Sequence, residues 1–113
     1  MVMKTGAAID VKPEQLALLK TLLNREVPAK TVWAYGSRVN GTAGPASDLD
    51  LVVFDPDTDS LANLREALSE SDLPFTVDVM DWNMIPERFQ KNIRKNYLVL
   101  QELPEYNREE NRP

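Results

Sequence analysis

Two hydrophobic patterns alternate along this chain, and their alternation limits the folds that it can adopt. Leucines recur at helical spacing in two segments, and runs rich in β-branched and aromatic residues lie between and after them. The first expected helix lies between Pro13 and Val27-Pro28 and carries Leu16, Leu19 and Leu23. The second follows a cap at Asp59 or Ser60 and carries Leu61, Leu64 and Leu68, and the third follows Pro86 and carries Phe89, Ile93 and Tyr97. The expected strands span residues 31–35, 48–54, 75–80 and 98–100. We therefore expect an α/β domain with helices packed on a small mixed β-sheet.

The 113 residues fit a single domain. We expect an N-terminal lead-in over residues 1–12, the folded domain over 13–102, and a polar, charged and flexible tail over 103–113. No apolar run approaches the roughly 20 residues that a membrane-spanning helix needs. The first residues are too short an apolar run for a secretory signal, so a soluble cytoplasmic protein without a membrane partner is expected.

Composition narrows the chemistry that the domain can perform. The chain has no cysteine and no histidine, which removes disulfides, thiolate and imidazole catalysis and the usual soft metal ligands. Carboxylates, hydroxyls, lysine, arginine and backbone amides remain, so any bound metal should be a hard ion such as Mg²⁺. With 13 basic and 18 acidic residues, the net charge of -5 argues against bulk nucleic-acid binding.

A glycine-serine turn follows directly after the strand at residues 31–35. Gly36 lets the backbone approach a phosphate closely, and Ser37 offers both an N–H and a hydroxyl. If the chain turns helical at Ser37, the free amides of that helix start favour an anion. Arg38 could add a charged contact to a triphosphate.

Three aspartates are placed to share a face of the sheet. In a strand, residues i and i+2 point the same way, so Asp48 and Asp50 point together and away from Leu49 and Leu51. If the next strand is a neighbour, Asp78 could meet Asp50 across the sheet. Such carboxylates repel one another, and divalent cations relieve the repulsion. Two ions about 3.5–4 Å apart are the recurrent arrangement for attack at phosphorus.

Two further features have simpler explanations. Parity places Asp81 opposite Asp78, where a role as a cap or turn residue before the next helix is favoured. The helix after Pro86 is basic, and a solvated face explains this most simply, with contact to a polyphosphate tail or an acidic partner as the alternative. Its basic residues are Arg88, Lys91, Arg94 and Lys95.

The segments WAYGSRVNGTAGPASDLDLVVF and PFTVDVMDW resemble the nucleotidyltransferase superfamily that includes DNA polymerase beta, and most closely its minimal nucleotidyltransferases. The resemblance covers residues 13–102 and implies a polymerase beta palm-like fold. It also implies that Gly36 and Ser37 bind the triphosphate of ATP and that Asp48, Asp50 and Asp78 bind magnesium, as metal ligands and catalytic residues. Family members often have a second arginine at the position of Asn40, so one phosphate or partner contact is in question.

Minimal members of this family are commonly encoded beside a small helical HEPN protein, in a pair that looks like a toxin–antitoxin system. The resemblance implies transfer of AMP from ATP to a tyrosine of the HEPN toxin, with this chain as antitoxin in a possible hetero-oligomer. The short chain supports a partner independently, because it has no extra domain to hold a small acceptor.

Other functions remain open at this level. A non-catalytic antitoxin would neutralise its partner by covering it, and a stable complex that neutralises without ATP would indicate this. Nucleotide transfer to a small molecule, such as an aminoglycoside, is disfavoured by the missing substrate domain. Transfer to an RNA end is disfavoured by the acidic balance of the chain.

Overall fold

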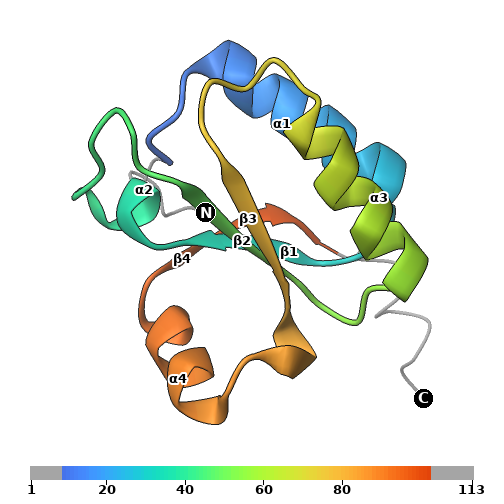
Figure 1. Cartoon of the computed structure of the whole chain (residues 1–113). Coiled ribbons are helices and arrows are strands. Elements are labelled where there is room, and N and C mark those ends of the chain that lie inside the picture. The colour runs from blue at the N-terminus through green and yellow to red at the C-terminus, as the bar shows by residue number, and fades with distance from the viewer. Residues whose placement is uncertain (1–8, 103–113) are drawn as a thin grey trace, which may run out of the picture.

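The computed structural model describes residues 9–102 and shows one sheet with helices on both sides (Figure 1). Residues 1–8 of the predicted lead-in and the predicted tail at 103–113 lie outside the described residues. In chain order the elements are α1 (Pro13–Glu26), β1 (Val32–Tyr35), α2 (Ser37–Asn40), β2 (Leu49–Val53), α3 (Thr58–Ser69), β3 (Val77–Asp81), the 3-10 helix η1 (Trp82–Met84), α4 (Glu87–Lys95) and β4 (Tyr97–Gln101). In residues 9–102, no helix is long and apolar enough to cross a membrane.

The sheet is mixed, as the alternation of patterns predicts. Its strand order is β3-β2-β1-β4. Strand β1 runs antiparallel to both β2 and β4, whereas β2 and β3 are parallel and are connected through α3. A parallel pair of strands needs a long crossover connection, and helix α3 forms it here.

One face of the sheet holds the larger apolar core. Leu49, Leu51 and Val53 of β2 point into it, because alternate residues of a strand share a face. Helices α1 and α3 cover this face (Figure 1). Each contributes the leucine stripe that its spacing predicts, and the buried members are Leu19, Leu22 and Leu23 in α1 and Leu61, Leu64 and Leu68 in α3.

The opposite face is covered in part by an aromatic cluster under η1 and α4. Trp33 of β1 stacks on Tyr97 of β4 with ring centroids 3.8 Å apart and meets Trp82 edge-on at 5.5 Å. Phe54 stacks on Trp82 at 4.6 Å. Both tryptophans are therefore packing residues. Val52 and Ile93 complete this smaller core.

The structure corrects several local predictions. Tyr97 does not continue the stripe of α4, because its backbone pairs with Tyr35 in the sheet. Phe89 is 55% exposed and does not pack on the sheet. Ile93 is the one buried residue of α4. The N-cap of α3 is Asp57, and neither Asp59 nor Ser60 takes that position. The turn η1 was not predicted.

Candidate functional site

Asp50 and Asp78 lie side by side on neighbouring strands. Strands β2 and β3 pair in parallel register with Asp50 opposite Asp78, so the expected meeting of the two residues across the sheet is confirmed. The same pairing sets Leu49 against Val77 and Leu51 against Val79, which face the larger core. The aspartates therefore share the opposite face, the one that carries the aromatic cluster. Adjacent strands are about 4.8 Å apart, which is a suitable spacing for two carboxylates that share a ligand.

The electrostatics of this pair show that the charges interact. The pKa of the Asp50 carboxyl is raised from its usual value, first by burial, then by the negative charge of Asp78 and then by that of Asp48. Asp50 is half-buried, whereas Asp48 and Asp78 are exposed. The most buried of the three carboxylates thus experiences the negative charge of the other two, and a cation bound there would relieve the repulsion.

Gly36 meets Asp50 at the end of β1. Its backbone angles, φ 87° and ψ -159°, lie in a region open essentially to glycine alone. A Cβ at this position would be 2.5 Å from Oδ2 of Asp50, well inside contact distance. The glycine therefore serves two purposes, since it makes the turn and leaves room for the carboxylate. Ser37 then begins α2, as expected, and among residues 9–102 its amide has no backbone acceptor.

Tyr35 also belongs to this site, and the sequence reasoning missed it. The register places it opposite Asp50 on one side and Tyr97 on the other. Burial, with smaller contributions from the charges of Asp50 and Asp78, raises the pKa of its phenol to about 12. Its position just before the glycine turn was a usable signal. Its contact with Asp50 also required knowledge that β1 pairs with β2.

Arg38, for which a triphosphate contact was predicted, makes structural contacts in this chain. Only 7% of the residue is exposed, and its guanidinium donates to three backbone carbonyls. Nη1 donates to Asp10 at 2.8 Å, Nε to Ser47 at 3.0 Å and Nη2 to Pro45 at 3.3 Å. The guanidinium also lies 4.3 Å over the ring of Phe75. Arg38 therefore holds the loop that leads to Asp48 in place, through three of its five N–H donors. The predicted contact with a triphosphate stays a prediction.

Asp81 has the capping role expected of it. It precedes η1, and its side chain accepts a hydrogen bond from the amide of Asn83 at 2.9 Å. Asp78 is therefore the third carboxylate that remains for the site.

The carboxylate oxygens of the three aspartates are suitable ligands for a hard divalent ion, although the three side chains do not converge on one point. Within residues 9–102, no three acidic side chains converge closely enough to form a ready metal site. The donor set fits Mg²⁺ nonetheless, because it is all oxygen and because Asp50 is destabilised by two like charges. Magnesium commonly binds through one or two carboxylates together with substrate phosphates, so a nucleotide can supply the remaining ligands.

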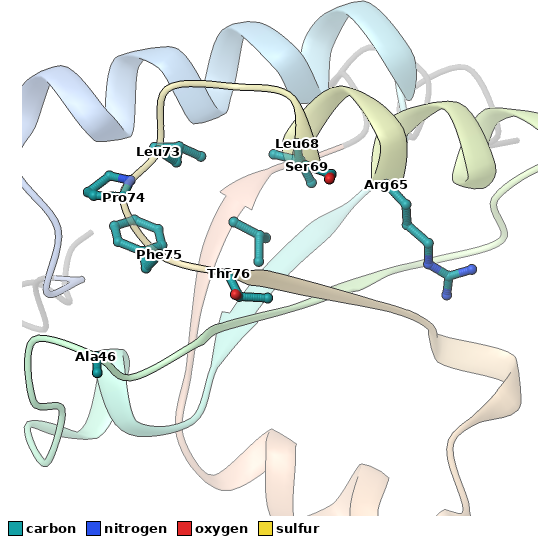
Figure 2. Close-up of a pocket in the computed structure, with 9 residues that line it drawn as sticks. Ala46, Arg65, Leu68, Ser69, Leu73, Pro74, Phe75 and Thr76 are labelled. Atoms are coloured by element: carbon teal, nitrogen blue, oxygen red, sulfur yellow. The ribbon is translucent and has the colours of Figure 1, made fainter.

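A pocket of about 490 Å³ lies elsewhere, along the outer edge of β3 (Figure 2). Leu68 and Ser69 of α3, the segment from Leu73 to Thr76, and Val77 line it. None of the three carboxylates Asp48, Asp50 and Asp78 lines this pocket, so it is separate from the candidate site. Arg65 donates through Nε and Nη2 to the carbonyl of Val79 and so covers part of this sheet edge.

The chain was compared with known protein families, and one family matches most of it. Residues 18–105 match the family described as polymerase beta, nucleotidyltransferase. The chain belongs to this nucleotidyltransferase family, and both the predicted fold and the predicted enzyme class are confirmed.

Individual relatives are consistent with this. The chain is 50% identical over 103 residues to a Haemophilus influenzae protein named probable protein adenylyltransferase MntA, and the match covers 88% of this chain and 90% of that protein. A crystal structure of a toxin–antitoxin with AMP-PNP has a TM-score of 0.64 at 22% identity and covers 87% of this chain and 79% of the matched chain. The toxin–antitoxin MntA–HepT has a TM-score of 0.59 at 18% identity, with coverage of 80% and 73%. At this identity the two structures show the shared fold.

Proposed function

We propose that this chain is a Mg²⁺-dependent adenylyltransferase that transfers AMP from ATP to a tyrosine hydroxyl of a helical HEPN-type toxin and so acts as its antitoxin. The observation that carries the proposal is the register of Asp50 with Asp78 beside the Gly36 turn. Two relationships support it. The Haemophilus relative is named a probable protein adenylyltransferase, and a toxin–antitoxin structure with AMP-PNP shares the fold.

The roles of the residues follow from their positions. The triphosphate lies against Gly36 and the amide of Ser37, which has no backbone acceptor among residues 9–102. A phosphate can approach a glycine backbone closely and accept a hydrogen bond from the N–H at a helix start. Asp48, Asp50 and Asp78 hold the magnesium, with two ions as the recurrent number for this chemistry. Bound Mg²⁺ would neutralise the carboxylates and the phosphates and favour the ionised acceptor oxygen.

The transfer itself exchanges one phosphorus–oxygen bond for another. The acceptor hydroxyl oxygen bonds to the α-phosphorus of ATP, and the bond from that phosphorus to the bridging oxygen breaks, so pyrophosphate leaves. The carboxylate of Asp78 takes the proton of the acceptor, because it is exposed on the edge strand, where a partner can reach it. Gly36 has no Cβ, so the turn leaves room for both the Asp50 carboxylate and the phosphate.

Labelled ATP tests this proposal directly. The purified chain is incubated with its HEPN-type partner, Mg²⁺ and ATP labelled at either the α- or the γ-phosphate. We expect the α label, and not the γ label, on the partner. Asp50→Asn should abolish transfer. Asp81→Asn is the matched control, because it makes the same change of side chain at the end of the neighbouring strand β3 and its amide oxygen can still cap η1.

Two results would contradict the proposal. Absence of α label on the partner would exclude AMP transfer to it. Neutralisation of the toxin by Asp50→Asn without ATP would instead favour the non-catalytic antitoxin, which acts by forming a complex.

A further inference from the structure

Helix α4 covers part of the carboxylate face of the sheet and is itself largely uncovered. Ile93 is its only buried residue. Two polar contacts hold the helix to η1, since Gln90 donates through Nε2 to the carbonyl of Trp82 at 2.9 Å and Arg94 lies 5.0 Å over the Trp82 ring. Figure 1 shows α4 standing out from the sheet on the side opposite α1 and α3. The remaining surface of α4 faces solvent.

That surface carries exposed apolar side chains. Met84 is 73% exposed and Phe89 is 55% exposed, and they lie in η1 and in the first half of α4. Large apolar side chains this exposed, five residues apart in the chain, are typical of a surface that contacts another protein. Phe89 lies one turn before Ile93, so it borders the packed stripe of the helix.

The charge of α4 contrasts with that of the whole chain. Its nine residues hold four of the 13 basic residues but only one of the 18 acidic ones. Arg94 is engaged with Trp82, whereas Arg88, Lys91 and Lys95 are exposed and follow one another at spacings of three and four residues. Such spacing places them on one face of the helix. A positive stripe therefore runs along an otherwise acidic protein.

This stripe ends in the same row of the sheet as the proposed catalytic Asp50, two strands away from it. Asn96 connects the last turn of α4 to Tyr97, which pairs with Tyr35, and Tyr35 pairs with Asp50. A molecule that lies along α4 and extends past Tyr97 over β1 would therefore reach Asp50.

We propose that Arg88, Lys91 and Lys95, with Phe89 and Met84 at their edge, form the docking surface for the acceptor protein, which offers an acidic patch next to an apolar one. The inference rests on the proposed function for the identity of the partner. Charge complementarity selects an acidic surface, and the two apolar side chains select protein over nucleic acid, which the net charge of -5 also disfavours. Docking here holds the acceptor on the face of the sheet that carries the carboxylates.

A charge-reversal experiment tests the docking surface. Binding of the HEPN-type partner is measured by isothermal titration in low salt without nucleotide, for the unmodified chain and for Arg88→Glu/Lys91→Glu. The matched control is Lys12→Glu/Lys20→Glu, which makes the same change in net charge at exposed positions in and just before α1, on the other face of the sheet. A third variant, Phe89→Ser, tests the apolar contact.

We expect the α4 double variant to bind at least roughly tenfold more weakly, with a difference that shrinks in high salt, while the α1 control binds normally. Equal losses in both double variants, or no loss in the α4 variant, would overturn the inference. So would preferential binding of a single-stranded RNA oligonucleotide that depends on the same lysine and arginine. If binding depends on α4 but no AMP is transferred, the docking surface stands and the proposed reaction fails.

Discussion

Replacing Gly36 with alanine tests whether one residue both shapes the turn and leaves room for Asp50. The backbone of Gly36 has φ 87° and ψ -159°, a combination that costs a residue with a Cβ about 1–3 kcal/mol. The new Cβ would also lie 2.5 Å from Oδ2 of Asp50, so the carboxylate must move. A side chain forced off its preferred rotamer adds about 0.5–1.5 kcal/mol. We expect Gly36→Ala to lower the free energy of unfolding by about 2–4 kcal/mol.

Two other glycines separate the two effects. Gly41 has the same φ of 87°, but a Cβ there meets nothing within 4 Å, so Gly41→Ala carries backbone strain alone, about 1–2 kcal/mol. Gly44 has neither a positive φ nor a neighbour within 4 Å, so Gly44→Ala should change stability by about 1 kcal/mol or less, in the stabilising direction.

The assay combines urea unfolding with AMP transfer, measured at a temperature where all three variants are folded. Only Gly36→Ala displaces a proposed catalytic carboxylate, and a displacement of about 1 Å can cost roughly 100-fold in rate. We expect that loss in Gly36→Ala and near-normal transfer in Gly41→Ala and Gly44→Ala. Normal transfer by Gly36→Ala, with a stability loss no larger than that of Gly41→Ala, would refute the reasoning.

Three further predictions concern buried or interacting polar groups. Arg38→Gln should lower the free energy of unfolding by about 2–4 kcal/mol in urea titration, because it removes charged, partly buried hydrogen bonds from a buried arginine to backbone carbonyls; an unchanged midpoint would contradict this. Burial and the charges of Asp78 and Asp48 raise the pKa of Asp50 in the folded chain. The folded state is therefore most stable when the Asp50 carboxyl is protonated, below the pKa of the unfolded chain, and loses this stability as pH rises through the folded pKa. Asp50→Asn should therefore be at least as stable as the unmodified chain at neutral pH, with the advantage vanishing in acid. Likewise, the raised pKa of Tyr35, about 12, predicts a loss of stability between pH 10 and 12 that Tyr35→Phe lacks; equal losses in both proteins would refute it.

Most of the predictable part of the site followed from the alternation of side chains along the strands. The period of two along β2 and β3 is local, so it placed Asp50 and Asp78 on a common face before the strand order was known. The leucine stripes of α1 and α3 were predictable for the same reason, since helical spacing is also local.

What the sequence did not reveal depends on contacts between distant segments. Arg38 donates to the carbonyl of Asp10, 28 residues earlier in the chain, so its structural role could not be inferred from the turn that contains it. Tyr35 reaches Asp50 only through the antiparallel pairing of β1 with β2. Tyr97 fitted the helical spacing of Phe89 and Ile93, but sheet pairing overrides spacing at the end of a short helix.

The intact mass of the partner tests the central claim most directly. The HEPN-type partner is purified after co-expression with the unmodified chain, with Asp50→Asn or with Gly44→Ala, and each sample is weighed by mass spectrometry. The account predicts a mass gain of one or more AMP units, located on a tyrosine, with the unmodified chain and Gly44→Ala but not with Asp50→Asn. A partner of unmodified mass in all three samples, or the same gain with Asp50→Asn, would contradict the account.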